Sequence, residues 1–174
     1  MSDIDFTSLD SAWDLSKEDP DKAMNICREF IIKYPESPYG YSERHHLHLK
    51  KGELREALAD CNRVIQLGPH EKGGFFARGE VHRKMGDYQK AIDDYDHAFE
   101  LDHEGWYGSM GLLSRLDCHA RLGNREQALA DCARLTDDFW TPGVFGLPAG
   151  NRADVTAKVL QLLDSAPRNG KRRT

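Results

Sequence analysis

The fold of this chain is decided by the stretch Gly86-Asp87-Tyr88-Gln89-Lys90-Ala91, which has counterparts at 52–57 and 123–128. Each of the three segments begins with glycine and ends with alanine. Ala57 and Ala91 are 34 residues apart, and Ala128 follows Ala91 after 37 residues. A fixed period of about 20 to 50 residues is the signature of stacked structural repeats. The spacing therefore predicts a solenoid, which presents binding surfaces more often than it performs chemistry.

The clearest unit runs from Gly74 to His103 and contains two amphipathic stretches. Apolar or small residues recur at helical spacing in both stretches, which are separated by 85–88. Gly86 suits the left-handed residue that ends a helix, and Asp87 suits the N-cap of the next helix. The unit is therefore predicted to be an antiparallel helical hairpin with a tight turn.

This pattern resembles the tetratricopeptide repeat. The unit at 72–105 matches the family at six of its eight characteristic positions, namely Phe75, Gly79, Gly86, Ala91, Tyr95 and Ala98. His82 and His103 depart from the family pattern at repeat positions 11 and 32. The resemblance implies an all-α fold: a right-handed α-α superhelix of about four helical hairpins, closed by a C-terminal capping helix.

The repeat positions, which we call the grid, also predict the organisation of the whole chain. Four repeats are expected at about 4–37, 38–71, 72–105 and 109–142, followed by a Gly/Pro loop at 143–150, a capping helix at 151–166 and a basic flexible tail at 167–174. The first repeat is the weakest match, because its opening helix lacks the small-residue pattern. The three extra residues before the fourth repeat are expected in the connection at 103–109. Asn151 or Asp154 is expected to cap the last helix.

Composition excludes several classes of protein. The 174 residues are 39% hydrophobic and 30% charged, which argues against disorder. The net charge of −5 gives no reason to expect a nucleic-acid partner. The apolar runs are far shorter than the ~20 residues that span a bilayer, and the acidic start at 1–6 is unlike a secretory signal. The sequence therefore predicts a cytoplasmic protein with no membrane partner.

The histidines and cysteines are candidates for metal binding or catalysis, but their positions in the repeat favour a packing role. His45, His46 and His48 look like a metal cluster, but His48, His82 and His119 all occupy repeat position 11, where the family packs an aromatic side chain. The cysteines at 27, 61 and 132 share repeat position 24, a predicted buried position where free cysteine behaves as a small hydrophobe. We therefore expect no metal, no cofactor and no catalytic residue. The acidic run at 93–96 is expected to be a solvated convex face.

The resemblance also implies a binding groove lined by the first helix of each repeat. Its candidates are Tyr39, Ser42, His46, Leu49, Phe76, Glu80, Arg83, Met110, Leu113 and Asp117. A groove of this mixed chemistry suits an extended peptide or an amphipathic helix. Some family members grip a peptide carboxylate with a clamp of Lys, Asn and Arg side chains. Neither register of this clamp places a lysine or arginine here, and one register places Glu43 in it, so no carboxylate clamp is expected.

Aromatic residues near the Gly/Pro-rich connections form a second candidate patch, made of Trp106, Tyr107, Phe139 and Trp140. They either pack under the connections or form an exposed surface, and the exposure of Trp140 separates the two. Three functional hypotheses follow. The leading one is a non-catalytic adaptor or scaffold that binds another protein. The alternatives are a self-associating structural protein that forms a homo-oligomer, and a metal-binding or enzymatic protein that uses the cluster at 45–48.

Overall fold

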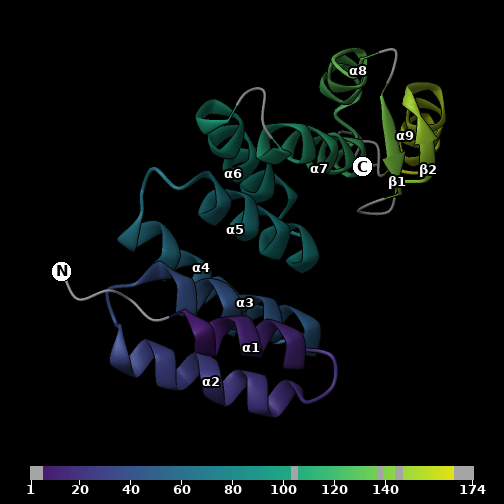
Figure 1. Ribbon diagram of the computed structural model, residues 1–174. Coiled ribbons are helices and arrows are strands. Elements are labelled where there is room, and N and C mark those ends of the chain that lie inside the picture. Colours follow the sequence, from purple (N-terminus) through teal and green to yellow (C-terminus); the bar gives the residue numbers. More distant parts are fainter. Residues whose placement is uncertain (1–5, 103–105, 137–138, 144–146, 167–174) are drawn as a thin grey trace, which may run out of the picture. The chain divides into compact units, whose positions relative to one another are not determined.

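The computed structural model describes residues 6–102, 106–136, 139–143 and 147–166 and is mostly helical (Figure 1). The chain divides into two compact units, 1–85 and 86–174. The first contains α1 (Thr7–Leu15), α2 (Pro20–Lys33), α3 (Pro38–Lys51), α4 (Leu54–Leu67) and α5 (Lys72–Met85). The second contains α6 (Tyr88–Leu101), α7 (Trp106–Leu122), α8 (Arg125–Ala133), β1 (Trp140–Pro142), β2 (Ala149–Asn151) and α9 (Arg152–Ser165). The prediction of an all-α fold is confirmed.

The glycines of the three repeated segments end helices as predicted. Gly52, Gly86 and Gly123 have φ angles of 75°, 83° and 74°, in the left-handed region that favours glycine. Asp87 occupies the N-cap position of α6, but its side chain makes no capping hydrogen bond. Its carboxylate instead accepts a hydrogen bond from Lys90 at 3.0 Å. The backbone conformation of glycine, more than the capping side chain, therefore defines this turn.

In the first unit, neighbouring helices in the sequence pack against each other around small apolar cores. One cluster joins α1, α2 and α3 and consists of Leu9, Ala12, Ala23, Met24, Cys27, Phe30 and Leu47. Gly40 allows the close approach of α3 to α2, because a Cβ atom at this position would lie 2.8 Å from the Ile31 side chain and 2.9 Å from that of Phe30. The helical hairpins are thus fixed by tight packing as well as by turn glycines.

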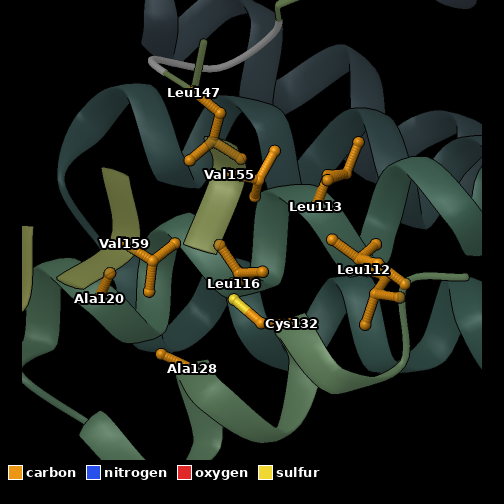
Figure 2. Close-up of a cluster of buried hydrophobic side chains, with 10 residues drawn as sticks. Leu112, Leu113, Leu116, Ala120, Ala128, Cys132, Leu147, Val155 and Val159 are labelled. Carbon is orange, nitrogen blue, oxygen red and sulfur yellow. The ribbon is translucent and has the colours of Figure 1, made fainter. Parts of the chain in front are cut away.

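The second unit is closed by its C-terminal segment. Figure 2 shows the buried cluster in which Val155 and Val159 of α9 lie with Leu113 and Leu116 of α7. Helix α9 begins as predicted, because Asn151 accepts hydrogen bonds from the backbone N–H groups of Ala153 and Asp154. The Asp154 carboxylate in turn accepts from the backbone N–H of Asn151, which completes a capping box.

Two details differ from the sequence-based expectation. Trp106 and Tyr107 were expected in a connection, but α7 begins at Trp106, so their backbone is helical. Helix α7 has 17 residues where α3 and α5 have 14, so the three extra residues of the last repeat interval lengthen a helix. Residues 106–109 contain no proline, so the chain can be helical from Trp106 onward. The residues around the Gly/Pro loop pair as an antiparallel two-stranded ribbon, with Thr141 opposite Gly150.

Candidate functional site

An open pocket of about 420 Å³ lies between α1 and α3 in the first unit. Both helices are the first helices of their repeats, the side on which the family places its groove. The lining residues come from the start of the first repeat and from the first two turns of α3. They are Phe6, Leu9, Asp10, Asp14, Tyr39 and Glu43. The pocket thus combines aromatic and apolar surface with three carboxylates.

Two exposed aromatic rings form the apolar part of this pocket. Phe6 stacks on the buried ring of Phe30, with the ring centroids 6.1 Å apart. Tyr39 meets Phe6 edge to face, with the centroids 5.0 Å apart. Phe6 is 39% exposed and Tyr39 is 54% exposed. The stacking holds the two rings in place while one side of each faces solvent, as in a binding site with preformed aromatic contacts.

The electrostatic environment of the pocket is acidic. Burial raises the pKa of Glu43, and the nearby negative charge of Asp10 raises it further. The positive charge of Lys50 opposes this shift, while the Lys50 ammonium donates a hydrogen bond to the Ser16 hydroxyl at 2.7 Å. The charged form of Glu43 is therefore less favourable than in water, and a cation entering the pocket would make it more favourable.

The candidate groove residues of α3 have different environments. Tyr39 lines the open pocket, and His46 is exposed beside a small gap that also touches Glu43 and Lys50. Ser42 is half-buried. Leu49 packs against the cluster of Ala57, Cys61 and Val81. Among the α3 candidates, Tyr39 and His46 are thus the most accessible.

The candidates on α5 and α7 are less accessible. Phe76 is 8% exposed and Glu80 is 9% exposed, and the Glu80 carboxylate accepts from the Arg83 guanidinium at 3.0 Å. Met110 is partly buried against the cluster of the second unit, and Leu113 belongs to that cluster (Figure 2). Asp117 is fully buried and accepts a hydrogen bond from Arg121 at 2.8 Å. The side chains of Phe76, Leu113 and Asp117 therefore offer little surface to a partner.

The aromatic patch is divided between exposed and packed residues. Trp140 on β1 is 65% exposed. Phe139 is partly buried against the cluster of the second unit. The side chains of Trp106 and Tyr107 lie outside the part of the chain whose side chains the structure describes. Of the two interpretations, exposure fits Trp140 and packing fits Phe139.

The rings of His45 and His46 lie side by side, with centroids 3.9 Å apart, but the histidines of the 45–48 segment differ in their hydrogen-bond partners. His45 is 2% exposed, and its ring Nδ1 hydrogen-bonds with the carbonyl oxygen of Ser42. His48 contacts the Glu53 carboxylate, with Nδ1 and Oε2 2.6 Å apart. Within the described ranges, no group of three or more His, Cys, Asp or Glu side chains is arranged to hold a metal ion.

All four cysteines are buried, and none of them forms a disulfide. Burial raises the pKa of the Cys27 thiol to about 12 and also raises that of Cys132. A thiol with a raised pKa is a poor nucleophile at neutral pH because it is protonated. These properties are those of structural cysteines.

The grid carries one signal that the sequence reasoning missed. An arginine at repeat position 7 is followed 16 residues later by an aspartate at position 23 in three repeats, namely Arg44 and Asp60, Arg78 and Asp94, and Arg115 and Asp131. Arg44 binds Asp60 through two hydrogen bonds of 2.9 and 2.7 Å, and Arg115 binds Asp131 through two of 2.9 and 2.6 Å. These pairs connect the two helices of a hairpin.

The expectation that residues 93–96 of α6 form a solvated acidic face is wrong. Asp94 is 5% exposed, so it is not part of a solvated surface. The neighbouring Asp96 forms an ion pair with Arg115 of α7. The run at 93–96 therefore mixes buried, paired and exposed carboxylates, because successive helical residues point about 100° apart.

Comparison with known proteins gives the same architecture. The tetratricopeptide repeat family matches residues 74–104. The described residues share the fold of tetratricopeptide repeat proteins. No curated protein matches its sequence. Within the described residues, no helix has the length and hydropathy that a membrane crossing requires.

Solved structures of low sequence identity share the repeat fold. MamA is 20% identical with a TM-score of 0.65, over 72% of this chain and 72% of MamA. YrrB, described as a tetratricopeptide repeat protein with an unusual peptide-binding site, is 18% identical with a TM-score of 0.62, over 72% of this chain and 64% of YrrB. The first repeat domain of Spaghetti (RPAP3), bound to the HSP90 peptide SRMEEVD, is 17% identical with a TM-score of 0.60, over 72% of this chain and 92% of that domain.

Proposed function

We propose that this chain is a non-catalytic protein-interaction module, an adaptor or scaffold that binds a peptide or helix of a partner protein. The observation that carries the proposal is the open pocket between α1 and α3, with the exposed rings of Phe6 and Tyr39 in its wall. Aromatic side chains supply much of the binding energy at protein interfaces. The pocket involves the first helices of two repeats, the helices that line the peptide groove in the tetratricopeptide family, and two of the matched structures contain a bound peptide.

The accessible part of the proposed groove lies in the first unit. Tyr39 and His46 are the exposed candidates there, whereas the buried candidates of α5 and α7 contribute to packing. We therefore centre binding on α1 and α3. We also propose that the protein acts in the cytoplasm.

Panning of a random peptide library on the immobilised chain tests this proposal. Enriched peptides should bind the wild-type chain and bind the Tyr39→Ser variant about tenfold more weakly, since an aromatic anchor contributes more than about 1 kcal/mol. Ile32→Ser is the matched control, because Ile32 on α2 is 81% exposed and does not line the pocket. A library that yields no enriched peptide, or peptides that bind Tyr39→Ser as tightly as the wild type, would contradict the proposal.

The second candidate function is self-association into a homo-oligomer. The exposed Trp140 favours self-association, because large aromatic side chains that are exposed in a monomer often become buried in an interface. Light scattering over a range of protein concentrations would show a mass that rises with concentration in the wild type and a constant monomer mass in Trp140→Ser. A wild-type chain that stays monomeric at all concentrations would exclude it.

A further inference from the structure

The pocket between α1 and α3 is suited to one long side chain with an apolar stem and a positively charged end. Its wall carries the exposed faces of Phe6 and Tyr39 together with Leu9, and its other lining residues are Asp10, Asp14 and Glu43. Lysine and arginine bury their methylene stems on apolar surface and keep the charged group among polar partners. A cation near an aromatic face and beside carboxylates gains from both contacts.

The first repeat differs from the others at two of the positions that line this pocket. Repeat position 3 is glycine in the second, third and fourth repeats, at Gly40, Gly74 and Gly111, where the helix lies close to the helix before it. The first repeat has Phe6 at this position. Repeat position 7 is arginine in the later repeats, but it is Asp10 in the first. Both departures add to the pocket: an aromatic ring replaces glycine, and a carboxylate replaces a guanidinium.

The partner of the position-7 side chain is also absent from the first repeat. In the second and fourth repeats the arginine at position 7 pairs with an aspartate at position 23. The first repeat has Ile26 at position 23 and Asp10 at position 7, so no such pair can form. The position that connects the two helices in other repeats is therefore available for contact with another molecule here.

The carboxylates of the pocket lack the partners that other carboxylates of the chain have. Asp60, Asp117 and Asp131 are each held by an arginine. In contrast, the Asp10, Asp14 and Glu43 side chains form no hydrogen bond or ion pair with another residue in the described ranges. Three unpaired carboxylates around a cavity with aromatic walls form a surface complementary to a cation.

We propose that this pocket binds a lysine or arginine side chain in an extended basic segment of a partner protein. The inference rests on the proposed peptide-binding function and specifies its partner. The aliphatic stem lies against Leu9 and the two aromatic rings, and the cationic group lies among Asp10, Asp14 and Glu43. The partner is the electrostatic opposite of the acidic peptide SRMEEVD that is bound in the Spaghetti structure.

Degenerate peptide pools test the charge of the partner without assuming its sequence. Each fluorescent pool is identical except for one fixed central residue, which is arginine, lysine, citrulline, glutamine or glutamate. The immobilised full chain should retain the arginine and lysine pools about tenfold more than the citrulline pool, the neutral analogue of arginine, because charged hydrogen bonds contribute about 1.5 to 3 kcal/mol. The preference should weaken between about 0.05 M and about 0.5 M salt through screening.

Matched charge variants locate the binding site. The double variant Asp10→Asn/Glu43→Gln should reduce the preference for basic pools about five- to tenfold, because it removes two of the carboxylates with little change in shape. The double control Glu18→Gln/Glu29→Gln removes the same charge from exposed positions outside the pocket and should change the preference less than about twofold. Circular dichroism checks that all variants are folded.

The outcomes separate this inference from the proposed function. Retention of the citrulline or glutamate pools at the level of the arginine pool would overturn the basic partner while peptide binding stood. Equal losses in the two double variants would overturn the pocket as the site. Retention of no pool would count against both proposals. If removal of the basic residues 167–174 raises retention of the basic pools severalfold, the chain's own tail is the occupant and a separate partner is excluded.

Discussion

At the scale of single residues, the segment from Arg44 to His48 shows how neighbouring histidines of one helix differ in burial and in polar partners, although the rings of His45 and His46 lie 3.9 Å apart. His45 is buried against the carbonyl oxygen of Ser42, His46 is exposed, and His48 contacts Glu53. Helical geometry turns each successive side chain by about 100°, so three histidines within four residues reach three environments. Each histidine must therefore be assigned its own role.

His45 should make the stability of the protein sensitive to acid. Burial, together with smaller contributions from the charges of His46 and His48, lowers the pKa of His45 to about 3. The unfolded chain binds a proton below about pH 6.5 while the folded chain does not, so stability is lost as the pH falls below 6.5. Between pH 7 and pH 5 the loss from this group should be about 1 to 2 kcal/mol.

Urea denaturation at the two pH values checks this prediction. The wild type should lose about 1 to 2 kcal/mol more on acidification than His45→Gln, which cannot be protonated. His97→Gln is the control, since His97 on α6 is an exposed histidine. Equal pH dependence in the wild type and His45→Gln would show that His45 does not cause the sensitivity.

At the scale of helices, we expect glycine-to-alanine substitutions at repeat position 3 to have opposite effects on stability in different repeats. Alanine favours a helix interior over glycine by about 1 kcal/mol. At Gly111 the nearest atom to an added Cβ would be 3.6 Å away, so Gly111→Ala should leave stability unchanged or raise it by up to about 1 kcal/mol. At Gly40 the added atom would lie 2.8 Å from Ile31, so Gly40→Ala should lower stability by about 1 to 2 kcal/mol. Thermal unfolding measures both, and a stabilised Gly40→Ala would refute the close approach of α3 to α2.

The arginine–aspartate pairs between the helices of a hairpin give a second prediction at this scale. Arg115 and Asp131 are both largely buried, with side-chain exposures of 14% and 6%. Asp131→Leu removes a carboxylate that neutralises the buried Arg115 guanidinium. It should lower the free energy of unfolding by about 3 kcal/mol, although Asp96 also contacts Arg115. The double variant Arg115→Met/Asp131→Leu should be more stable than the single variant, because no unpaired charge is buried. Urea denaturation compares them, and a double variant less stable than Asp131→Leu would contradict this account.

At the scale of the whole molecule, the repeat period predicts the hairpins but not the accessible surface. Turn glycines and buried cysteines follow from local spacing, so the sequence is enough to predict them. The burial of Leu113 depends on Leu147, Val155 and Val159, which lie outside the repeats and whose packing the grid does not contain. The pocket depends on Phe6 and Asp10, where the first repeat departs from the pattern. Rules that describe a regular repeat cannot predict features that arise where the repeat is irregular.

The division into two compact units predicts that damage to one core stays local. Leu116→Ala creates a cavity in the core of the second unit and should cost about 2 to 5 kcal/mol there. Repeat proteins gain stability mainly from neighbouring contacts, so hydrogen exchange should increase in α7, α8 and α9 and stay unchanged in α1 and α2. Met24→Ala, in the α1–α3 core, should give the reverse pattern. If both variants raise exchange equally along the whole chain, the protein unfolds as one cooperative body and the local prediction is wrong. If the predicted patterns hold, the α1–α3 pocket keeps its shape when the other unit is weakened, and binding to it can be measured in Leu116→Ala.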